Sequence, residues 1–437
     1  MVVERRELLC RERPVLAFSV DVASGRAVGS GEVIDPARLP LEFVDHGKLS
    51  VFASRIDDWW SARAVPRTRD HIRAGLESLG LQAPTELLKR SFGLSLSDQY
   101  WVRPLGSGVR WRDVNFFTNA FDEDLGKALF SSFSSSAELD FNSPDATSGG
   151  DLPKRWTIDP STGTRLLMKG GRYNQEPLNE RIASELCSRL GVAHVRYRLA
   201  QFDNRLVSVC AEMLSDDEEL VSAWHTVNAF KADNQLGRKG QWIASACAFG
   251  ADEHEIETAT DGFILVDFLM RNTDRHYGNF GLIRNVESLR VRPAPVYDTG
   301  TSLWAGELQV DNRDYVSKPF FTSQGKPTAR RQLRLLTPGS WERLDLSALA
   351  GWPSFVAHEL SRYDQLPSGR ISSIEQAVAG RVEQVRYERD LALHSTSSTL
   401  FTSTMPDASQ TQHLPEHGTD PTGLDFMGHR PDPGITR

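Results

Sequence analysis

Hydrophobic positions recur at helical spacing in one segment near the middle of the chain. Within 177–190 the apolar residues stand four apart, a spacing that gathers them on one face of a helix; they are Leu178, Ile182, Leu186 and Leu190. Pro177 suits the first position of a helix, and Gly191 suits the residue that ends one. The pattern therefore predicts an amphipathic helix over 177–190, with Glu180 beside its apolar face.

Short apolar runs on both sides of this helix predict strands. The runs 195–202 and 205–213 flank Asp203-Asn204, a favourable turn dipeptide, and this pattern is typical of a hairpin. Before the helix, a short apolar strand ends at Lys169. From residue 244 to about 393 the pattern is mostly helical.

The first 130 residues predict a mixed helical and strand module. The segments 15–22 and 27–33 are expected to pair as a hairpin, and 66–94 has apolar residues at helical spacing. The aromatic-rich segment 95–130 is expected to pack against a neighbouring domain.

Composition along the chain suggests four parts. A segment rich in Ser, Asp and Gly follows residue 130, and the end of the chain has no hydrophobic periodicity, so that burial there cannot offset the entropy of ordering. We predict an N-terminal accessory module at 1–135, a small lobe at 136–214, a large lobe at 215–394 and a disordered tail at 395–437.

Charge and cysteine content exclude several classes of function. The net charge of -8 argues against a protein that coats nucleic acid, and no direct nucleic-acid contact is expected. The four cysteines form no CxxC pair, which disfavours a structural zinc site. The charged first residues do not resemble a signal peptide, and no apolar run suits a membrane span. A cytoplasmic location without membrane contact is expected.

Three oxygen-bearing side chains follow a long apolar run. Asp274 and Asn279 are five residues apart, and Asp298 follows 24 residues after Asp274. Phosphoryl transfer needs a carboxylate that orients the attacking hydroxyl and oxygen ligands that hold Mg²⁺ on the nucleotide phosphates. Protein kinases use an Asp and an Asn at this separation. Each residue alone is a common turn residue, but the three together indicate a kinase catalytic loop.

A lysine and a glutamate before this loop fit the same chemistry. In ATP-dependent kinases a strand lysine contacts the phosphates and is held by a helix glutamate. Lys169 at the end of its strand and Glu180 in the predicted helix suit these roles. Alone, they would be read as a strand-end lysine and a solvated glutamate.

Two further segments are candidates for nucleotide binding. The strand that ends near 213 leads into Glu212-Met213-Leu214, where a kinase would receive adenine on its backbone. The glycine-containing segment before the lysine strand can cradle phosphate through backbone amides; its candidate residues are Ser148, Gly149, Gly150 and Lys154. An ordinary linker is an equally good interpretation of this second segment.

At these residues the chain resembles the HipA-like serine/threonine kinases, which are bacterial toxin kinases distantly related to phosphatidylinositol kinases. The resemblance lies in 272–281 together with 294–298, and it extends to Ser148-Gly149, Lys154, Lys169 and Asn179-Glu180. It covers roughly residues 140–390. It implies an α+β, bilobed protein-kinase-like fold, with a small β-rich lobe and a large helical lobe.

The resemblance also implies roles for individual residues. Asp274 would be the catalytic base, and His276 would hold the loop or touch the transferred phosphate. Asn279 and Asp298 would bind Mg²⁺, and Lys169, positioned by Glu180, would contact ATP.

The implied activity is transfer of the ATP γ-phosphate to Ser or Thr hydroxyls, on the chain itself and on a partner protein. The family precedent is a toxin that phosphorylates translation machinery and has an antitoxin partner. In related toxins a serine of the glycine-containing loop is autophosphorylated, so Ser148 or Thr147 is a candidate acceptor.

Three alternatives remain open from the sequence. The loop also resembles that of phosphatidylinositol kinases, which suggests a lipid or small-molecule kinase. A nucleotide-binding pseudokinase or transcriptional cofactor would normally lack the lysine, the base or a metal ligand, and all are present here. A metal-dependent hydrolase would use Asp267, Asp274, His276 and Asp298, but it would leave Lys169 and Glu180 unexplained.

Overall fold

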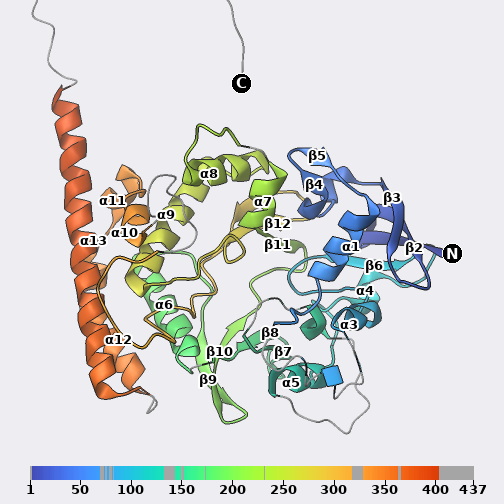
Figure 1. The fold of residues 1–437 in the computed structure, drawn as a ribbon, viewed down its shortest axis with the longest axis horizontal. Coiled ribbons are helices and arrows are strands. Elements are labelled where there is room, and N and C mark those ends of the chain that lie inside the picture. Colours follow the sequence, from blue (N-terminus) through green and yellow to red (C-terminus); the bar gives the residue numbers. More distant parts are fainter. Residues whose placement is uncertain are drawn as a thin grey trace, which may run out of the picture. The chain divides into compact units, whose positions relative to one another are not determined.

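The structure is a computed structural model, and it describes most of the chain. The described residues are 2–68, 73, 76–77, 81, 83–131, 143–147, 149, 152–172, 174–230, 232–316, 328–362 and 366–402. Met1–Leu393 form one compact unit, and His394–Arg437 form a second. Figure 1 shows the elements in chain order.

The N-terminal module is built on a four-stranded antiparallel sheet. Its strands, in the order β3-β2-β1-β6, are Ala27–Val33, Arg13–Asp21, Val3–Cys10 and Tyr100–Pro104. Its helices are α1 (Ala53–Ala62), α3 (Thr85–Arg90), α4 (Trp111–Val114) and α5 (Asp124–Ser131). A small hairpin joins β4 (Val44–Asp45) to β5 (Lys48–Leu49).

The predicted N-terminal hairpin is confirmed as the pairing of β2 with β3. The expected helical segment 66–94 contains α3, and part of it lies outside the described residues. The pattern did not predict β1 or α1. The aromatic segment packs as expected, because Trp101, Trp111 and Phe116 share a core cluster with Trp156 and Leu214 of the small lobe.

The small lobe is a second antiparallel sheet with one long helix against it. Its strands, in the order β7-β8-β10-β9, are Lys154–Ile158, Arg165–Lys169, Arg205–Ala211 and Arg198–Phe202. The β9–β10 hairpin is confirmed, with Asp203 and Asn204 both at positive φ in the turn. The predicted helix is α6 (Glu176–Leu190), which packs on β9 and β10 and ends at Gly191 with φ 67°.

The large lobe is mainly helical and carries a three-stranded sheet. The strands are β11 (Glu218–Ser222), β12 (Gly281–Asn285) and β13 (Val291–Pro293). The helices are α7 (Ala223–Ala229), α8 (Arg238–Ala248), α9 (Glu253–Met270), α10 (Ala329–Leu333), α11 (Pro338–Arg343), α12 (Trp352–Ser361) and α13 (Ser368–Thr402). The largest hydrophobic core gathers residues of α6, α9, α12 and α13.

The predicted α+β kinase-like fold class is confirmed. Helix α13 ends at Thr402, eight residues after the predicted end of the large lobe at 394, and the bounds of the predicted tail stay a prediction. The remainder, 403–437, lies outside the described residues. Among the described residues, no helix combines the length and the apolar character that crossing a membrane requires.

Gly281 shows how tightly the start of β12 packs on β11. A Cβ atom on Gly281 would lie 2.1 Å from the carbonyl oxygen of Val221. We therefore expect Gly281→Ala to lower the free energy of unfolding by about 1–3 kcal/mol, since the two strands would have to separate. Gly108 has open space around its Cα, so Gly108→Ala is the matched control in urea denaturation. Equal stability of the two variants would contradict this packing.

Candidate active site

One cavity of about 740 Å³ contains most of the residues that the sequence singled out. It is lined by strand, loop and helix residues of both lobes. The predicted site residues that line it are Gly149, Lys154, Lys169, Glu212, Met213, Leu214, Asp274, His276, Asn279 and Asp298. Glu180 is buried behind Lys169, and Ser148 and Gly150 lie outside the described residues.

Lys169 is the buried cation of the cavity. Only 4% of it is exposed, and its ammonium group donates to Glu180 and, at 2.7 Å, to Asp298. Glu180 also accepts from the hydroxyl of Ser208 on β10. The expected pairing of Lys169 with Glu180 is present, and it includes Asp298 as a third member.

The two carboxylates fix the charge state of Lys169. Burial alone would lower the pKa of Lys169, but Asp298 and Glu180 outweigh it and hold this pKa well above its ordinary value. Burial would likewise raise the pKa of Asp298, yet Lys169, then Lys154 and Arg275, keep it well below its ordinary value. Lysine and carboxylate are therefore both charged at neutral pH.

Helix α6 holds the segment that follows Asp298. The amide of Asn179 donates to the carbonyl oxygens of Gly300 and Ser302 at 2.8 and 2.7 Å, and Gln175 donates to that of Leu303 at 2.8 Å. Asp298 itself has φ 56°, a left-handed conformation that needs such support. The first turn of α6 thus positions Lys169 and the Asp298 segment together.

Arg275 anchors the loop 272–279, a role that the sequence did not reveal. Its guanidinium, 1% exposed, bonds Asp267 at 3.0 and 3.1 Å and donates to the carbonyl oxygens of Asn279 and Tyr297. Asn272 also donates to Asp267, at 2.8 Å. Asp267 therefore serves as a structural partner of Arg275, which removes it from the ligand set of the hydrolase alternative.

The loop presents Asp274, His276 and Asn279 to the cavity. The backbone N–H of Asp274 donates to the side chain of Asn272 at 3.0 Å. The side-chain amide nitrogen of Asn279 donates to the backbone carbonyl oxygen of Asp274 at 2.9 Å. This second bond orients the amide oxygen of Asn279 as the atom that a cation would take. His276 is exposed and accepts from the N–H of Gly278 at 3.0 Å.

A metal site in this cavity needs ligands beyond the protein's own acidic residues. In the part of the chain that the structure describes, no group of three or more His, Cys, Asp or Glu side chains is arranged to hold a metal. Asn279 and Asp298 nevertheless both line the cavity. Such a sparse set of oxygen ligands suits Mg²⁺, which keeps waters and shares the phosphates of its substrate.

The segment after β10 brings a partly buried carboxyl group to the cavity. Glu212 accepts from the N–H of Leu214 at 2.9 Å. Burial raises the pKa of Glu212 to about 8, although the N–H groups of Leu214 and Met213 partly offset this effect. Lys154, which also lines the cavity, donates to the carbonyl oxygen of Gly149 at 2.9 Å.

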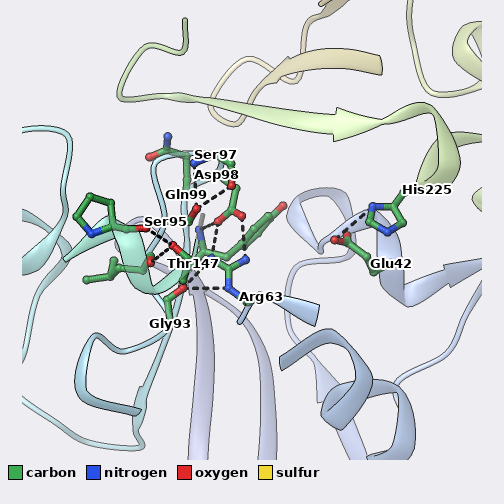
Figure 2. Close-up of polar contacts among 12 residues, drawn as sticks. Glu42, Arg63, Gly93, Ser95, Ser97, Asp98, Gln99, Thr147 and His225 are labelled. Atoms are coloured by element: carbon green, nitrogen blue, oxygen red, sulfur yellow. Dashed lines mark hydrogen bonds and ion pairs between the residues drawn. The ribbon is translucent and has the colours of Figure 1, made fainter. Parts of the chain in front are cut away.

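The cavity has a second wall that sequence reasoning missed. Figure 2 shows the polar contacts of this wall, which the N-terminal module and α7 supply. Its lining residues include Glu42, Trp59, Arg63, Ser97, Asp98 and His225. No local motif marks them, because they come from separate segments of the chain.

The raised pKa of Glu212 predicts a pH dependence of stability. The folded pKa lies above the unfolded value of about 4.3, so folding takes up a proton between these values. The stability that this group contributes is complete below about pH 4 and is lost as the pH rises through about 8. We expect urea denaturation between pH 5 and 8.5 to show a steeper loss for the wild type than for Glu212→Gln. Parallel pH profiles would contradict the raised pKa.

Comparisons with known proteins show what the chain is similar to. No protein-family model matches the chain. Over 151 residues, 33% of this chain, it is 26% identical to the serine/threonine-protein kinase CtkA of Helicobacter pylori, and the match spans 44% of that kinase's length. The crystal structure of the Helicobacter pylori proinflammatory kinase CtkA covers 56% of this chain and 95% of its own, with TM-score 0.44 and 15% identity.

A second solved structure covers far more of the chain. HipA of the Shewanella oneidensis MR-1 toxin–antitoxin system, in a complex with HipB and its operator DNA, covers 88% of this chain and 99% of its own. The TM-score is 0.56 at 14% sequence identity. The HipA-like fold that the catalytic-loop residues predict is therefore confirmed for this chain.

Proposed function

We propose that the chain is an ATP-dependent serine/threonine kinase of the HipA type. One observation carries the proposal: a buried lysine, Lys169, contacts both Glu180 and Asp298 in the cavity that also exposes Asp274 and Asn279. Phosphoryl transfer depends on positioning and charge, and these residues supply both.

Each residue has a definite task in this proposal. Lys169 binds the nucleotide phosphates, and Glu180 keeps it aimed into the cavity. Asp274 orients the attacking hydroxyl and accepts its proton. Asn279 and Asp298 would hold Mg²⁺, which neutralises charge on the phosphates when it is bound. Because Lys169 keeps its contact with Glu180, Asp298 is able to turn from the lysine towards a cation.

The adenine would lie against the backbone of Glu212–Leu214, as the sequence suggests. The wall there combines this backbone with apolar side chains of the small lobe. Trp156, Leu167 and Cys210 line the same cavity. An apolar pocket with a few backbone hydrogen-bonding groups is typical of sites for planar ligands.

The acceptors in this proposal are Ser or Thr residues of the chain itself and of a partner protein. The proposed toxin role has translation machinery as a target and an antitoxin-like protein as a partner. It rests on the resemblance to HipA, which is in a complex with HipB and operator DNA in the Shewanella oneidensis structure. The expectation that this chain makes no direct nucleic-acid contact stays a prediction. A lipid or small-molecule kinase predicts different labelled products, which acceptor screening with labelled ATP separates.

The first test removes the proposed base. We expect Asp274→Asn to slow autophosphorylation from labelled Mg-ATP at least about a hundredfold, since a positioned base typically contributes that much. Asp58, an exposed residue of α1, provides the matched control as Asp58→Asn, with wild-type rates expected. Comparable labelling of Asp274→Asn and the wild type would overturn the assignment.

The second test locates the phosphate on the glycine-containing loop. The hydroxyl of Thr147 is buried and donates to the carbonyl oxygens of Leu94 and Pro144 at 2.9 and 3.1 Å. It cannot attack ATP without breaking both bonds, so we expect mass spectrometry after incubation with Mg-ATP to find phosphate on Ser148 rather than Thr147. Asp274→Asn is the inactive control. Phosphate on Thr147, or on neither residue, would count against this expectation.

A further inference from the structure

The N-terminal module forms part of the same cavity as the catalytic loop. Its segment 94–98 contacts both lobes. The carbonyl oxygen of Ser97 accepts from the N–H of Leu220 on β11 at 2.9 Å, and that of Leu94 accepts from the hydroxyl of Thr147 at 2.9 Å. The nucleotide roles proposed above use none of the module's residues. Its wall is therefore available for another ligand.

Most polar groups on this wall are already engaged with one another. Arg63 binds Asp98 through two bonds of 2.8 and 3.0 Å and donates to the carbonyl oxygen of Gly93. Asp98 also accepts from the N–H of Tyr100 at 2.9 Å, and the hydroxyls of Ser95 and Ser97 are 2.7 Å apart. Figure 2 shows this closed network. The charges of Arg63 and Asp98 cancel, and they leave little capacity for a ligand.

Glu42 differs from these groups because, within the part of the chain that the structure describes, its carboxylate pairs with a histidine and with no lysine or arginine. It lies in the short 3-10 helix Leu41–Phe43, and its carboxylate is 3.5 Å from Nδ1 of His225. That contact is an ion pair only while the imidazole is protonated. The two side chains are 34% and 38% exposed, so a ligand in the cavity can reach both.

His225 places this carboxylate beside the catalytic loop. It belongs to the first turn of α7, where the N–H of Trp224 donates to the carbonyl oxygen of Tyr277, and that of Ala223 donates to Phe280, each at 2.9 Å. The Glu42–His225 pair therefore stands next to the loop that carries Asp274 and His276. A side chain bound there would flank the group that reacts at Asp274.

We propose that Glu42 forms an acceptor subsite that binds a lysine or arginine side chain of the protein segment presented to Asp274. This inference rests on the proposed kinase function and names its substrate class as basic Ser/Thr segments. A carboxylate accepts charge-assisted hydrogen bonds from either cation. The incoming cation replaces His225 as the partner of Glu42, while the Arg63–Asp98 network stays intact.

The experiment measures binding and transfer separately. Fluorescent peptides with one central serine, flanked by arginine, alanine or glutamate, are titrated into the full chain by fluorescence polarisation, and labelled ATP then reports transfer. The wild type is expected to prefer the arginine peptide over the alanine peptide. Glu42→Gln should weaken binding of the arginine peptide by up to roughly fivefold, the upper end of the range for exposed ion pairs, and Glu42→Lys should favour the glutamate peptide.

Glu32, a strongly exposed carboxylate of the same module that does not line the cavity, provides the control as Glu32→Gln, with wild-type preference expected. A wild type that binds arginine and alanine peptides equally overturns the subsite, and so does a Glu42→Gln variant with unchanged preference. Arginine preference in binding without phosphate transfer from ATP to any peptide would instead refute the kinase proposal and leave the subsite in place.

Discussion

The site depends on one buried ammonium group held between two carboxylates. Removing one partner of a buried ion pair typically costs about 3–5 kcal/mol, because the remaining charge is left without compensation. Lys169 is the last residue of β8, Glu180 lies in α6, and Asp298 follows β13. Two ion pairs of one lysine thus connect the small lobe, its helix and the large lobe in the cavity proposed to hold the nucleotide's phosphates.

The charge balance of this cluster explains why it suits phosphate chemistry. Lys169 contributes one positive charge, and Glu180 and Asp298 contribute two negative charges, so the group has a net charge of -1. A phosphate would meet the lysine, while a cation would be drawn to Asp298 and to the amide oxygen of Asn279. Arg275 holds the backbone beside both of these residues through the carbonyl oxygens of Asn279 and Tyr297. The backbone on either side of the proposed cation site is therefore held in place without a ligand, which would lower the cost of binding one.

Local sequence signals account for the elements that were predicted, and their absence accounts for those that were missed. Helix α6 has apolar residues on one face and clear end signals, and the β9–β10 hairpin has a turn dipeptide that accepts positive φ. Four of the eight residues of strand β1 are charged, and only its last four residues are buried, so its alternation is weak. Helix α1 buries only Ile56 and Trp59. Both elements depend on partners distant in sequence.

Some residues of the candidate site were predictable from the sequence, and others were not. Asp274, Asn279 and Asp298 follow a spacing set by the chemistry, whereas Arg275 and Asp267 serve the backbone and leave no spacing rule. The role of Asp267 was ambiguous, because the sequence does not distinguish an aspartate that pairs with a buried arginine from one that binds a metal. The wall with Glu42 and Arg63 could not be predicted from the sequence, because its residues come from segments that only the tertiary fold brings together.

Hydrogen bonds connect the N-terminal module to β12, the strand that follows the proposed catalytic loop. The guanidinium of Arg284 on β12 pairs with Glu219 on β11, and it donates to the carbonyl oxygen of Ala37 and, at 2.9 Å, to the hydroxyl of Tyr100. Strand β12 begins at Gly281, two residues after Asn279. A displacement of the module would therefore move the strand that supports the proposed metal ligand. For this reason an acceptor bound as proposed, against the module and the loop together, would meet one continuous surface whose parts are linked by hydrogen bonds.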